Sequence, residues 1–529
     1  MLHPALLPTT PPPSWPGVDQ TPARLSLAAL AQAQVRPTAP AISEDGRLWS
    51  YAQLDQAVGE AAELLRARGL RRGDRVMLIG ENSLALAAFI LAAGQLDACA
   101  VLENARRAPM EVDAIRAHCQ PRLVVHLSQH SPDARAHAQR HGALELTLPT
   151  VGTLCITPQA ADDCELDVVA GSADDMAVLI YTTGTTGAPK GVMLSHGNLL
   201  YLGGMMVRLR ELTHADRVYG VLPITHVMGL VAVFGATLRA GAHLHLVPRF
   251  VPTHCAAALA EGGITVLQGA PAMFSKLADH ARQHPFSAPA LRFIGAGGAP
   301  IDATVKAEMR ALFGLTLHNG YGLTEGSGLC WTRLDPPRDD CSVGLPLPGV
   351  ELRVLSREGG AVAPGEVGEL WARGPNVMKG YYRNPALTAQ VMRPGGWFNT
   401  QDLARIADDG HVFIEGRSKE LIISGGFNVY PLEVEIALNA HPAIVQSAVV
   451  ARQVGGNEEV IAFVEPAAGA RLTLAALQAF LAERLSPYKR PREVYLMPAL
   501  PSSPNGKVLK GRLKSLAQAG AADEAERLV

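Results

Sequence analysis

A run rich in threonine and glycine, residues 181–191, has the residue types of a phosphate-binding loop. It reads Tyr-Thr-Thr-Gly-Thr-Thr-Gly-Ala-Pro-Lys-Gly and follows an apolar run, 176–180, that is typical of a buried strand. Hydroxyls and backbone N–H groups can cradle an anion, and a lysine adds a mobile positive charge. It is not a Walker A loop, because Pro189 replaces the second glycine and Gly191 replaces the Ser or Thr that would hold magnesium. The alternative is a flexible surface turn. The candidate phosphate ligands are Thr182, Thr183, Gly184, Thr185, Thr186 and Lys190.

Five further motifs follow along the chain and offer complementary chemistry. Residues 295–300, Gly-Ala-Gly-Gly-Ala-Pro, follow a predicted strand and offer exposed backbone to a flat ligand. Residues 319–325 supply an amide, an aromatic face, a hydroxyl and a carboxylate. Residues 400–403 and 416–419 add an acid and a base, and residues 501–507 place a lysine just after a turn. Each motif alone could be structural, but six in this order indicate one site.

The elements that position these motifs change character twice along the chain. From about residue 48 to 345, short apolar runs alternate with helical patterns, which predicts an α/β fold with mostly parallel sheets and helices on both faces. After residue 349, short strands separated by glycine and proline turns indicate a small β-barrel or distorted sheet. Near residue 419 a compact α+β domain begins. The expected strands are 75–79, 123–125, 177–180, 218–222, 244–247, 264–267, 291–294 and 315–317, and the expected helices include 84–93, 198–209, 272–281 and 302–312.

Composition excludes several other classes of protein. The 529 residues are 48% hydrophobic and 18% charged with a net charge of −2, which argues against nucleic acid as a partner. The seven cysteines form no C-x-x-C pair, as expected for free thiols in a reducing cytoplasm. Residues 1–25 are proline-rich and predict a loose tail. Residues 219–238 lack charge but contain proline and glycines, so we expect buried strand, loop and helix and no transmembrane segment.

With these motifs the chain resembles the adenylate-forming superfamily, in particular its acyl- and aryl-CoA ligases such as 4-coumarate–CoA ligase. The resemblance runs from about residue 48 to 513. It implies an N-terminal domain, 26–417, built from two sheet-and-helix subdomains and a small β-barrel. A mobile α+β lid domain, 418–529, is implied to follow it. It also implies ATP, Mg2+ and CoA as partners of a carboxylic acid, in a monomer or homodimer.

The resemblance assigns roles to residues of this chain. Residues 182–190 would hold the β- and γ-phosphates of ATP, Asn319 would bond the exocyclic amine of adenine and Tyr321 would stack on its ring. Thr324 would contact the α-phosphate, and Glu325 would ligate magnesium, a hard ion that prefers carboxylate oxygen. Lys507 would bridge the substrate carboxylate and the α-phosphate. The adenine plane would be lined by Gly297, Gly298 and Ala299, and the ribose held by Asp402 and Arg417.

The implied reaction has two halves. A carboxylate first displaces pyrophosphate from ATP, which gives an acyl-adenylate. The small domain then swings about Lys419, withdraws Lys507 and presents the hairpin of Ser424, Gly425 and Gly426 to form a tunnel for the pantetheine of CoA. The thiolate finally displaces AMP.

Three positions depart from the family pattern. Gln401 stands where glycine is usual, Ser502 and Ser503 stand where a basic residue and threonine are usual, and Thr183 is commonly serine. None of these removes a reacting group, but Gln401 adds bulk beside the expected ribose site.

The sequence constrains the identity of the substrate acid and of the thiol acceptor less than it constrains the nucleotide site. Residues 223–229 contain no acidic side chain to hold an ammonium, which argues against amino acids. Small residues near the expected acyl pocket and no basic residue there favour an aromatic or medium-chain monocarboxylate. His226 could contact the acid or be a core histidine. The acceptor could be a carrier-protein pantetheine, and a non-catalytic sensor of AMP or acyl-adenylate is the remaining alternative. The acyl-pocket candidates are Thr225, His226, Gly295, Gly320 and Gly326.

Overall fold

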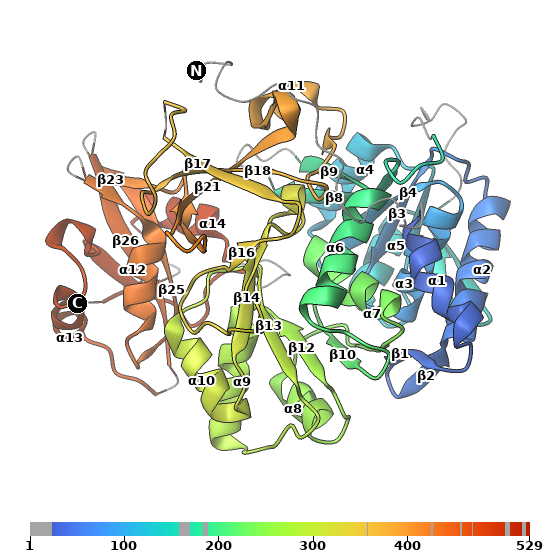
Figure 1. The fold of residues 1–529 in the computed structure, drawn as a ribbon, viewed down its shortest axis with the longest axis horizontal. Helices are drawn as coiled ribbons and strands as arrows, with labels where there is room; N and C mark the ends of the chain where they lie inside the picture. Colours follow the sequence, from blue (N-terminus) through green and yellow to red (C-terminus); the bar gives the residue numbers. More distant parts are fainter. Residues whose placement is uncertain are drawn as a thin grey trace.

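Two large sheets with a shared layer of helices form the first three-quarters of the molecule (Figure 1). The computed structural model describes residues 24–157, 170–183, 189–356, 358–424, 427–454, 457–467, 469–502, 508–520 and 525–528. Both sheets are parallel at their centres, as the βα alternation predicts. Within the described ranges, none of the helices combines the length and hydropathy that a bilayer crossing needs.

The first sheet has eight strands and contains the apolar run that precedes the threonine-rich loop. Its central strands are buried on both faces, which explains why they are continuous hydrophobic runs. In spatial order the strands are β19 (Gly380–Tyr381), β9 (Pro189–Ser195), β8 (Met176–Thr183), β4 (Cys99–Asn104), β3 (Arg75–Gly80), β5 (Leu123–His126), β7 (Gly152–Ile156) and β6 (Leu144–Leu148).

The second sheet has nine strands and carries the glycine-rich motif and residues 319–321. The expected strands 264–267, 291–294 and 315–317 extend further toward their carboxyl ends than predicted, because polar and glycine residues there still pair in the parallel ladder. In spatial order the strands are β16 (Leu345–Pro346), β15 (Cys330–Trp331), β14 (Leu317–Tyr321), β13 (Phe293–Ala296), β12 (Val266–Gly269), β10 (Arg217–Gly220), β11 (His243–Leu246), β1 (Pro40–Glu44) and β2 (Arg47–Ser50).

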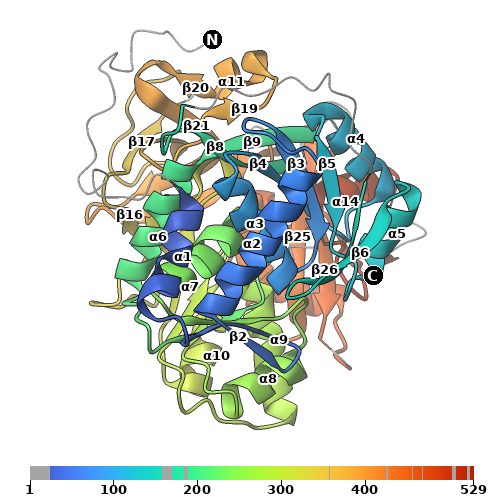
Figure 2. The same cartoon turned by 90° about the vertical axis from the view of Figure 1, so that its right-hand side faces the viewer.

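The helices form three layers around these sheets. Helix α3 (Leu84–Gln95) contacts strands of both sheets and is buried almost all round, which is why its sequence shows no polar face. Figure 2 shows it in the layer with α1 (Leu25–Val35), α2 (Tyr51–Ala67), α6 (His196–Leu209) and α7 (Ala236–Arg239). The outer faces are covered by α4 (Pro109–Cys119) and α5 (Pro132–Arg140) on one side, and by α8 (Pro252–Ala260), α9 (Pro271–Gln283) and α10 (Ala303–Phe313) on the other.

The structure corrects the sequence prediction at one local feature and agrees with it at another. Arg24 and Leu25, which we assigned to a loose tail, are buried, because Arg24 forms ion pairs with Asp97 and Asp175 and leads into α1. The uncharged stretch 219–238 contains the end of β10, a loop, a π-helix, η2 (Met228–Gly235), and α7, as expected for a buried strand, loop and helix.

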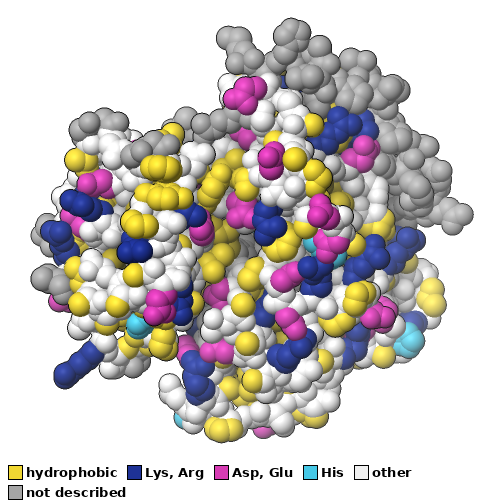
Figure 3. All heavy atoms as spheres, turned by 60° about the vertical axis from the view of Figure 1, so that its left-hand side comes forward, with side chains coloured by type: hydrophobic (Ala, Val, Ile, Leu, Met, Phe, Trp, Pro, Cys, Tyr) yellow, Lys and Arg dark blue, Asp and Glu magenta, His cyan; other side chains and the backbone are white. Residues whose placement is uncertain are grey.

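The rest of the chain forms an antiparallel sheet and a smaller α+β unit with its own hydrophobic cores. The antiparallel sheet occupies the position predicted for the small barrel, and its strands are β17 (Glu351–Leu355), β18 (Gly368–Arg373), β20 (Met392–Arg393), β21 (Trp397–Ile406) and β22 (Val412–Arg417), with α11 (Pro385–Val391) before β20. The C-terminal unit comprises β23 (Ile422–Ser424), β24 (Phe427–Val429), α12 (Pro431–Asn439), β25 (Ile444–Val454), β26 (Asn457–Pro466), α13 (Leu474–Ala482), β27 (Glu493–Leu496), α14 (Lys510–Gln518) and β28 (Glu526–Arg527). The α/β class and the small C-terminal domain are confirmed. Figure 3 shows a furrow, lined by hydrophobic and acidic side chains, between this C-terminal lobe and the remainder of the molecule.

Candidate active site

The threonine-rich loop is the connection of a β-hairpin. Strands β8 and β9 pair antiparallel, with Thr182 opposite Lys190 and Thr183 opposite Pro189. The strand after the loop was not predicted, because Pro189 and Gly191 disfavour a strand and obscure its pattern. Ser195 then caps α6 by accepting a hydrogen bond from the Asn198 N–H at 3.1 Å. Gly184, Thr185 and Thr186 lie outside the described residues.

Lys190 and Glu325 are brought together by Tyr381, a residue that no sequence motif marked. Strand β19, which carries Tyr381, pairs with β9, and the Lys190 Nζ lies 5.8 Å from the centre of the Tyr381 ring. The Tyr381 hydroxyl donates a hydrogen bond of 2.9 Å to Oε1 of Glu325. A half-buried carboxylate therefore lies close to the phosphate-loop lysine, and its second oxygen makes no hydrogen bond to the described residues. A hard cation fits this arrangement.

Thr324 and Glu325 are held in a short 3-10 turn, Thr324–Gly326. The Glu325 carbonyl accepts a hydrogen bond of 2.8 Å from the Met378 N–H, and the Asn376 amide donates one of 2.7 Å to the Gly326 carbonyl. Thr324 is buried. The turn is thus fixed by the segment that also carries Tyr381.

Tyr321, Asp402 and Arg417 form a connected polar group across β14, β21 and β22. The Tyr321 hydroxyl donates a hydrogen bond to the Asp402 carboxylate, and the Arg417 Nε lies 3.3 Å from Oδ1 of Asp402. Burial and then the negative charge of Asp402 raise the pKa of Tyr321 well above its ordinary value, so it remains a neutral donor. Burial alone would lower the pKa of Arg417, but Asp402 and Glu420 raise it above its ordinary value. Tyr321 and Arg417, which the resemblance assigns to adenine and ribose, thus both contact Asp402.

The Asn319 side chain offers an unused acceptor. Its Nδ2 donates a hydrogen bond of 2.7 Å to the Ser342 carbonyl, whereas its Oδ1 is buried and has no hydrogen-bond partner among the described residues. An unsatisfied buried carbonyl is costly, so a ligand N–H is the complementary group. Of the glycines expected to line the adenine, Gly298 is exposed with φ of +83°, whereas Gly297 is buried and packs closely against Met228, since a Cβ there would lie 2.8 Å from the Met228 sulfur.

Gln401 occupies a left-handed backbone conformation, with φ of +60°. Its carbonyl accepts a hydrogen bond of 3.0 Å from the Ser418 N–H, and its own N–H donates to Oδ1 of Asn399 at 2.8 Å. An L-residue in this region costs about 1–2 kcal/mol, which glycine avoids. The departure from the family glycine therefore brings backbone strain next to Asp402 in addition to bulk.

Thr225 and His226 lie on the loop between β10 and η2, and Asn82 fixes this loop. The Asn82 Nδ2 lies 3.0 Å from the carbonyl oxygens of Gly220 and Leu222, and its Oδ1 accepts a 2.8 Å hydrogen bond from the Ile224 N–H. The same Nδ2 is 3.2 Å from the Val247 carbonyl. Asn82 precedes α3, so one side chain ties the first sheet to the second at the expected acyl pocket. Sequence analysis did not identify it.

The space above two predicted pocket glycines is filled by neighbouring side chains. A Cβ on Gly295 would lie 2.5 Å from Oε1 of Gln268, and one on Gly320 would lie 2.1 Å from the Trp331 ring. Gly326 is buried against Leu323 and Leu329. These glycines therefore permit close packing by an amide and an aromatic ring.

In the C-terminal unit, the segment after Lys507 is joined to the segment after Lys419. Nζ of Lys510 lies 2.9 Å from Oε2 of Glu420 and 2.8 Å from Oε1 of Glu435, which also accepts from the Val449 N–H at 2.7 Å. Partial burial, and then the charges of Lys190 and Arg417, lower the pKa of Lys419. Ser424 ends β23, whereas Gly425, Gly426 and Lys507 itself lie outside the described residues.

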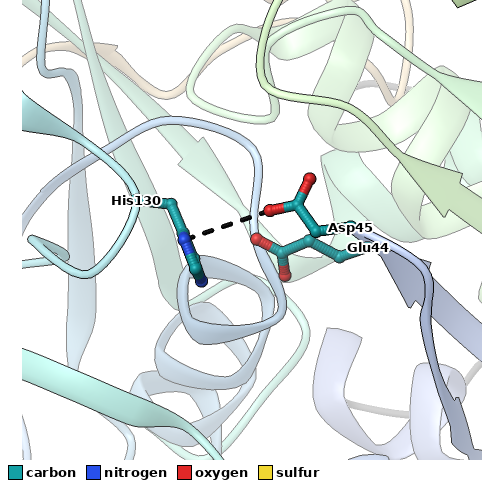
Figure 4. A group of neighbouring side chains, drawn as sticks. All are labelled: Glu44, Asp45 and His130. Carbon is teal, nitrogen blue, oxygen red and sulfur yellow. Dashed lines mark ion pairs between the residues drawn. The ribbon is translucent and has the colours of Figure 1, made fainter.

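A second acidic group lies at the turn between β1 and β2. Figure 4 shows Glu44, Asp45 and His130 facing one another, with Nδ1 of His130 4.0 Å from Oδ2 of Asp45. Glu44 already accepts a hydrogen bond of 2.8 Å from the Leu84 N–H, and Asp45 and His130 are exposed. The buried carboxylate therefore has a structural role at the start of α3.

Comparison with known proteins agrees with this geometry. The sequence matches the AMP-binding enzyme family over residues 30–382 and the AMP-binding enzyme C-terminal domain over residues 433–507. It is 35% identical over 486 residues to a feruloyl-CoA synthase of Amycolatopsis sp, which covers 91% of this chain and 97% of that protein. It is 31% identical over 517 residues to 4-coumarate–CoA ligase 2 of Oryza sativa subsp. japonica, with 92% and 91% covered. The structure of ATP-bound MatB from Rhodopseudomonas palustris matches at a TM-score of 0.82 and 32% identity, covering 94% of this chain and 99% of that one.

Proposed function

Because the chain belongs to the AMP-binding enzyme family, we propose that it is an ATP-dependent carboxylic acid–CoA ligase. It forms an acyl-adenylate and pyrophosphate, and then an acyl-CoA thioester and AMP. The observation that carries this proposal is the meeting of Lys190, Tyr321, Glu325, Asp402 and Arg417, which four separate chain segments contribute.

The nucleotide half of the site follows from the groups described above. The hairpin from Thr182 to Lys190 binds the β- and γ-phosphates, and the positive charge of Lys190 compensates part of their negative charge. The unsatisfied Oδ1 of Asn319 accepts from the exocyclic amine of adenine, which lies against Gly297, Gly298 and Ala299. Tyr321 packs on the ring, while Asp402 and Arg417 bind the ribose hydroxyls.

The reacting centre is built by three side chains. Glu325 holds Mg2+, which supplies charge neutralisation for the triphosphate, and Tyr381 orients the Glu325 carboxylate. Thr324 contacts the α-phosphate. Lys507 attracts the substrate carboxylate and the α-phosphate together, so that the carboxylate oxygen attacks phosphorus in line with the leaving pyrophosphate.

The second half-reaction uses the same chamber after the C-terminal unit, residues 418–529, turns about Lys419. Lys510 is fixed to Glu420, so the Lys507 segment moves together with the residues next to the hinge. The turned unit brings Ser424, Gly425 and Gly426 to the entrance, where they line the path of the pantetheine thiol.

Of the aromatic and medium-chain carboxylic acids, we favour an aromatic acid, which binds between the Thr225–His226 loop and the backbone of Gly295, Gly320 and Gly326. Support comes from the aromatic rings of Phe293 and Trp331 beside these glycines and from the relatives named for feruloyl-CoA and 4-coumarate. CoA is the acceptor, as the names of both relatives indicate.

Two assays test the proposal. Pyrophosphate release with ATP and a panel of aromatic acids, without CoA, detects adenylation, and a nucleotide sensor would release none. Single-turnover measurements on Lys507→Ala should show adenylation slowed by about 10²–10³, with thioester formation from supplied adenylate near the parent rate. Lys419→Pro should have the opposite effect, because fixing φ restricts the hinge alone. Equal losses in both steps for both variants would contradict the alternating lid.

A further inference from the structure

A guanidinium group without a counter-ion among the described residues is buried between η2 and the second sheet. Arg210, which follows the last residue of α6, has no solvent exposure. Its Nη1 donates to the Ala232 carbonyl in η2, but its Nε and Nη2 are buried and have no hydrogen-bond partner among the described residues. No carboxylate within the described ranges forms an ion pair with it. Burial lowers the pKa of Arg210 to about 9, so the group still carries its charge at neutral pH.

Two aromatic rings flank this charge and compensate it only in part. The Arg210 Cζ lies 5.0 Å from the centre of the Trp331 ring and 5.7 Å from that of Phe293. A cation–π contact offsets only part of the free-energy cost of removing an ion from water. The free protein therefore carries an uncompensated charge at this point.

The side chains next to Arg210 also have unused polar atoms. Both side-chain polar atoms of Gln268, Oε1 and Nε2, and the Trp331 Nε1 are buried and make no hydrogen bond to the described residues. Gln268 is opposite Gly295 in the ladder of β12 and β13, and Phe293 lies on the same strand as Gly295. Arg210 and Gln268 thus lie beside Phe293, and Arg210 also lies against Trp331; we call Arg210, Trp331 and Gln268 the polar cluster. The cluster has N–H donors on all three residues but a single acceptor, Oε1 of Gln268.

The polar cluster lies behind the segments assigned to the acyl pocket. Trp331 occupies the space above Gly320, Gln268 and Phe293 occupy the space above Gly295, and Ala232 follows the Thr225–His226 loop in η2. A ligand group that displaced the Trp331 or Phe293 ring from the side of the glycines would contact N–H donors and the positive charge of Arg210. The complementary chemistry is an oxygen acceptor.

We propose that the polar cluster is the far end of the acyl pocket, and that it selects acids with an oxygen substituent remote from the activated carboxylate. This inference rests on the proposed function. The oxygen belongs to a ring hydroxyl or alkoxy group or to a second carboxylate, which share acceptor chemistry. In each case the Nε and Nη2 of Arg210 donate to it, and Gln268 contributes a donor or accepts from a hydroxyl. Binding requires Trp331 or Phe293 to turn aside, because the polar atoms are closed off from solvent in this structure.

The test compares cinnamate with 4-hydroxycinnamate, 4-methoxycinnamate and 4-carboxycinnamate as substrates for the parent protein and for Arg210→Met. We measure kcat/KM from pyrophosphate release. We expect the parent to prefer at least one oxygenated acid, and Arg210→Met to lower kcat/KM for that acid by about 10- to 100-fold, as for the loss of a charge-assisted hydrogen bond. The kcat/KM for cinnamate should change by less than about threefold, because cinnamate has no remote oxygen that the guanidinium could bind. The acid with the largest loss identifies whether a neutral or an anionic oxygen is bound.

Two controls separate this inference from other outcomes. Arg208→Met removes an exposed arginine from the last turn of α6 and should leave all ratios unchanged. Arg210→Met should keep or raise the melting temperature of the free protein, because an apolar side chain of similar length replaces an unpaired buried charge. Equal losses for all four acids, or a lower melting temperature with the ratios unchanged, would overturn the inference and make Arg210 structural. Should Arg210→Met fail to fold, Arg210→Lys keeps the charge but loses the planar fork, and an unchanged preference in that variant would also overturn it. If the parent releases no pyrophosphate with any acid, the proposed function itself fails.

Discussion

Replacing Tyr381 with phenylalanine removes one hydroxyl from the candidate magnesium site and nothing else. The hydroxyl gives Oε1 of Glu325 a hydrogen bond of 2.9 Å, while the ring lies 5.8 Å from Nζ of Lys190. Phenylalanine keeps the ring, so the contact with Lys190 should persist. Any change in Tyr381→Phe therefore reports on how Glu325 is oriented.

The size of the effect follows from the exposure of Glu325. A hydrogen bond to a charged group contributes about 1.5–3 kcal/mol. Glu325 is half-buried, so water can replace part of this contribution, and we expect the lower limit, which corresponds to about tenfold. The apparent affinity for Mg2+ should fall by that factor, whereas KM for the acid should not change.

The assay is the initial rate of pyrophosphate release across a magnesium titration at fixed ATP and saturating acid. Tyr382→Phe is the matched control, since the Tyr382 ring faces His118, with ring centres 6.1 Å apart. Tyr381→Leu, which also removes the ring, should additionally raise KM for ATP. If the magnesium dependence of Tyr381→Phe coincides with that of the parent, Tyr381 does not orient a metal ligand, and the argument for Glu325 is refuted with it.

Three further predictions concern other parts of the molecule. Gln401→Gly should raise the free energy of unfolding in urea by about 0.5–1 kcal/mol, since relief of the left-handed strain exceeds the entropy cost of glycine; a lower stability would contradict the strain. Asn319→Leu should weaken ATP binding by about tenfold without changing KM for the acid, and unchanged nucleotide affinity would show that Oδ1 has no ligand partner. Burial and then the charge of His141 lower the pKa of His126 to about 3, whereas an unfolded histidine takes up its proton near pH 6.5. As the pH falls from about 6.5 toward 3, His126 takes up a proton in the unfolded chain but not in the folded protein, so the free energy of unfolding declines. In His126→Leu this contribution is absent, so its free energy of unfolding should decline less steeply over this interval than that of the parent.

The sequence predicted the sheets and the order of the site motifs because their signals are local. Helix α3 and strand β3 are apolar along their length, and such runs specify buried elements without further context. The threonine-rich loop and the 319–325 segment are likewise recognisable from residue type alone.

Residues that act through long-range contacts could not be predicted in this way. Tyr381 lies 56 positions from Glu325 in the chain and Arg210 lies 121 positions from Trp331, so their contacts depend on strand pairing. Arg210 lies outside the segments in which the sequence analysis looked for a basic residue, for the same reason. At the end of α6 it resembles an ordinary helix-terminal arginine, and only the packing of η2 and β13 buries it.

Asn82 has a consequence for how the molecule opens. Asn82 lies in the segment before α3, and its side-chain amide forms hydrogen bonds with backbone groups at the ends of β10 and β11. One side chain thus links the two sheets through several hydrogen bonds. If one sheet separated from the other, the Ile224 N–H and the carbonyls around it would lose their partners at once. Because these hydrogen bonds break together, a partly opened state would be high in free energy. Amide hydrogen exchange at the Ile224 N–H should therefore be as slow as in the central strands. The two sheets should then unfold as one cooperative unit, even though their strands form two separate hydrogen-bonded ladders.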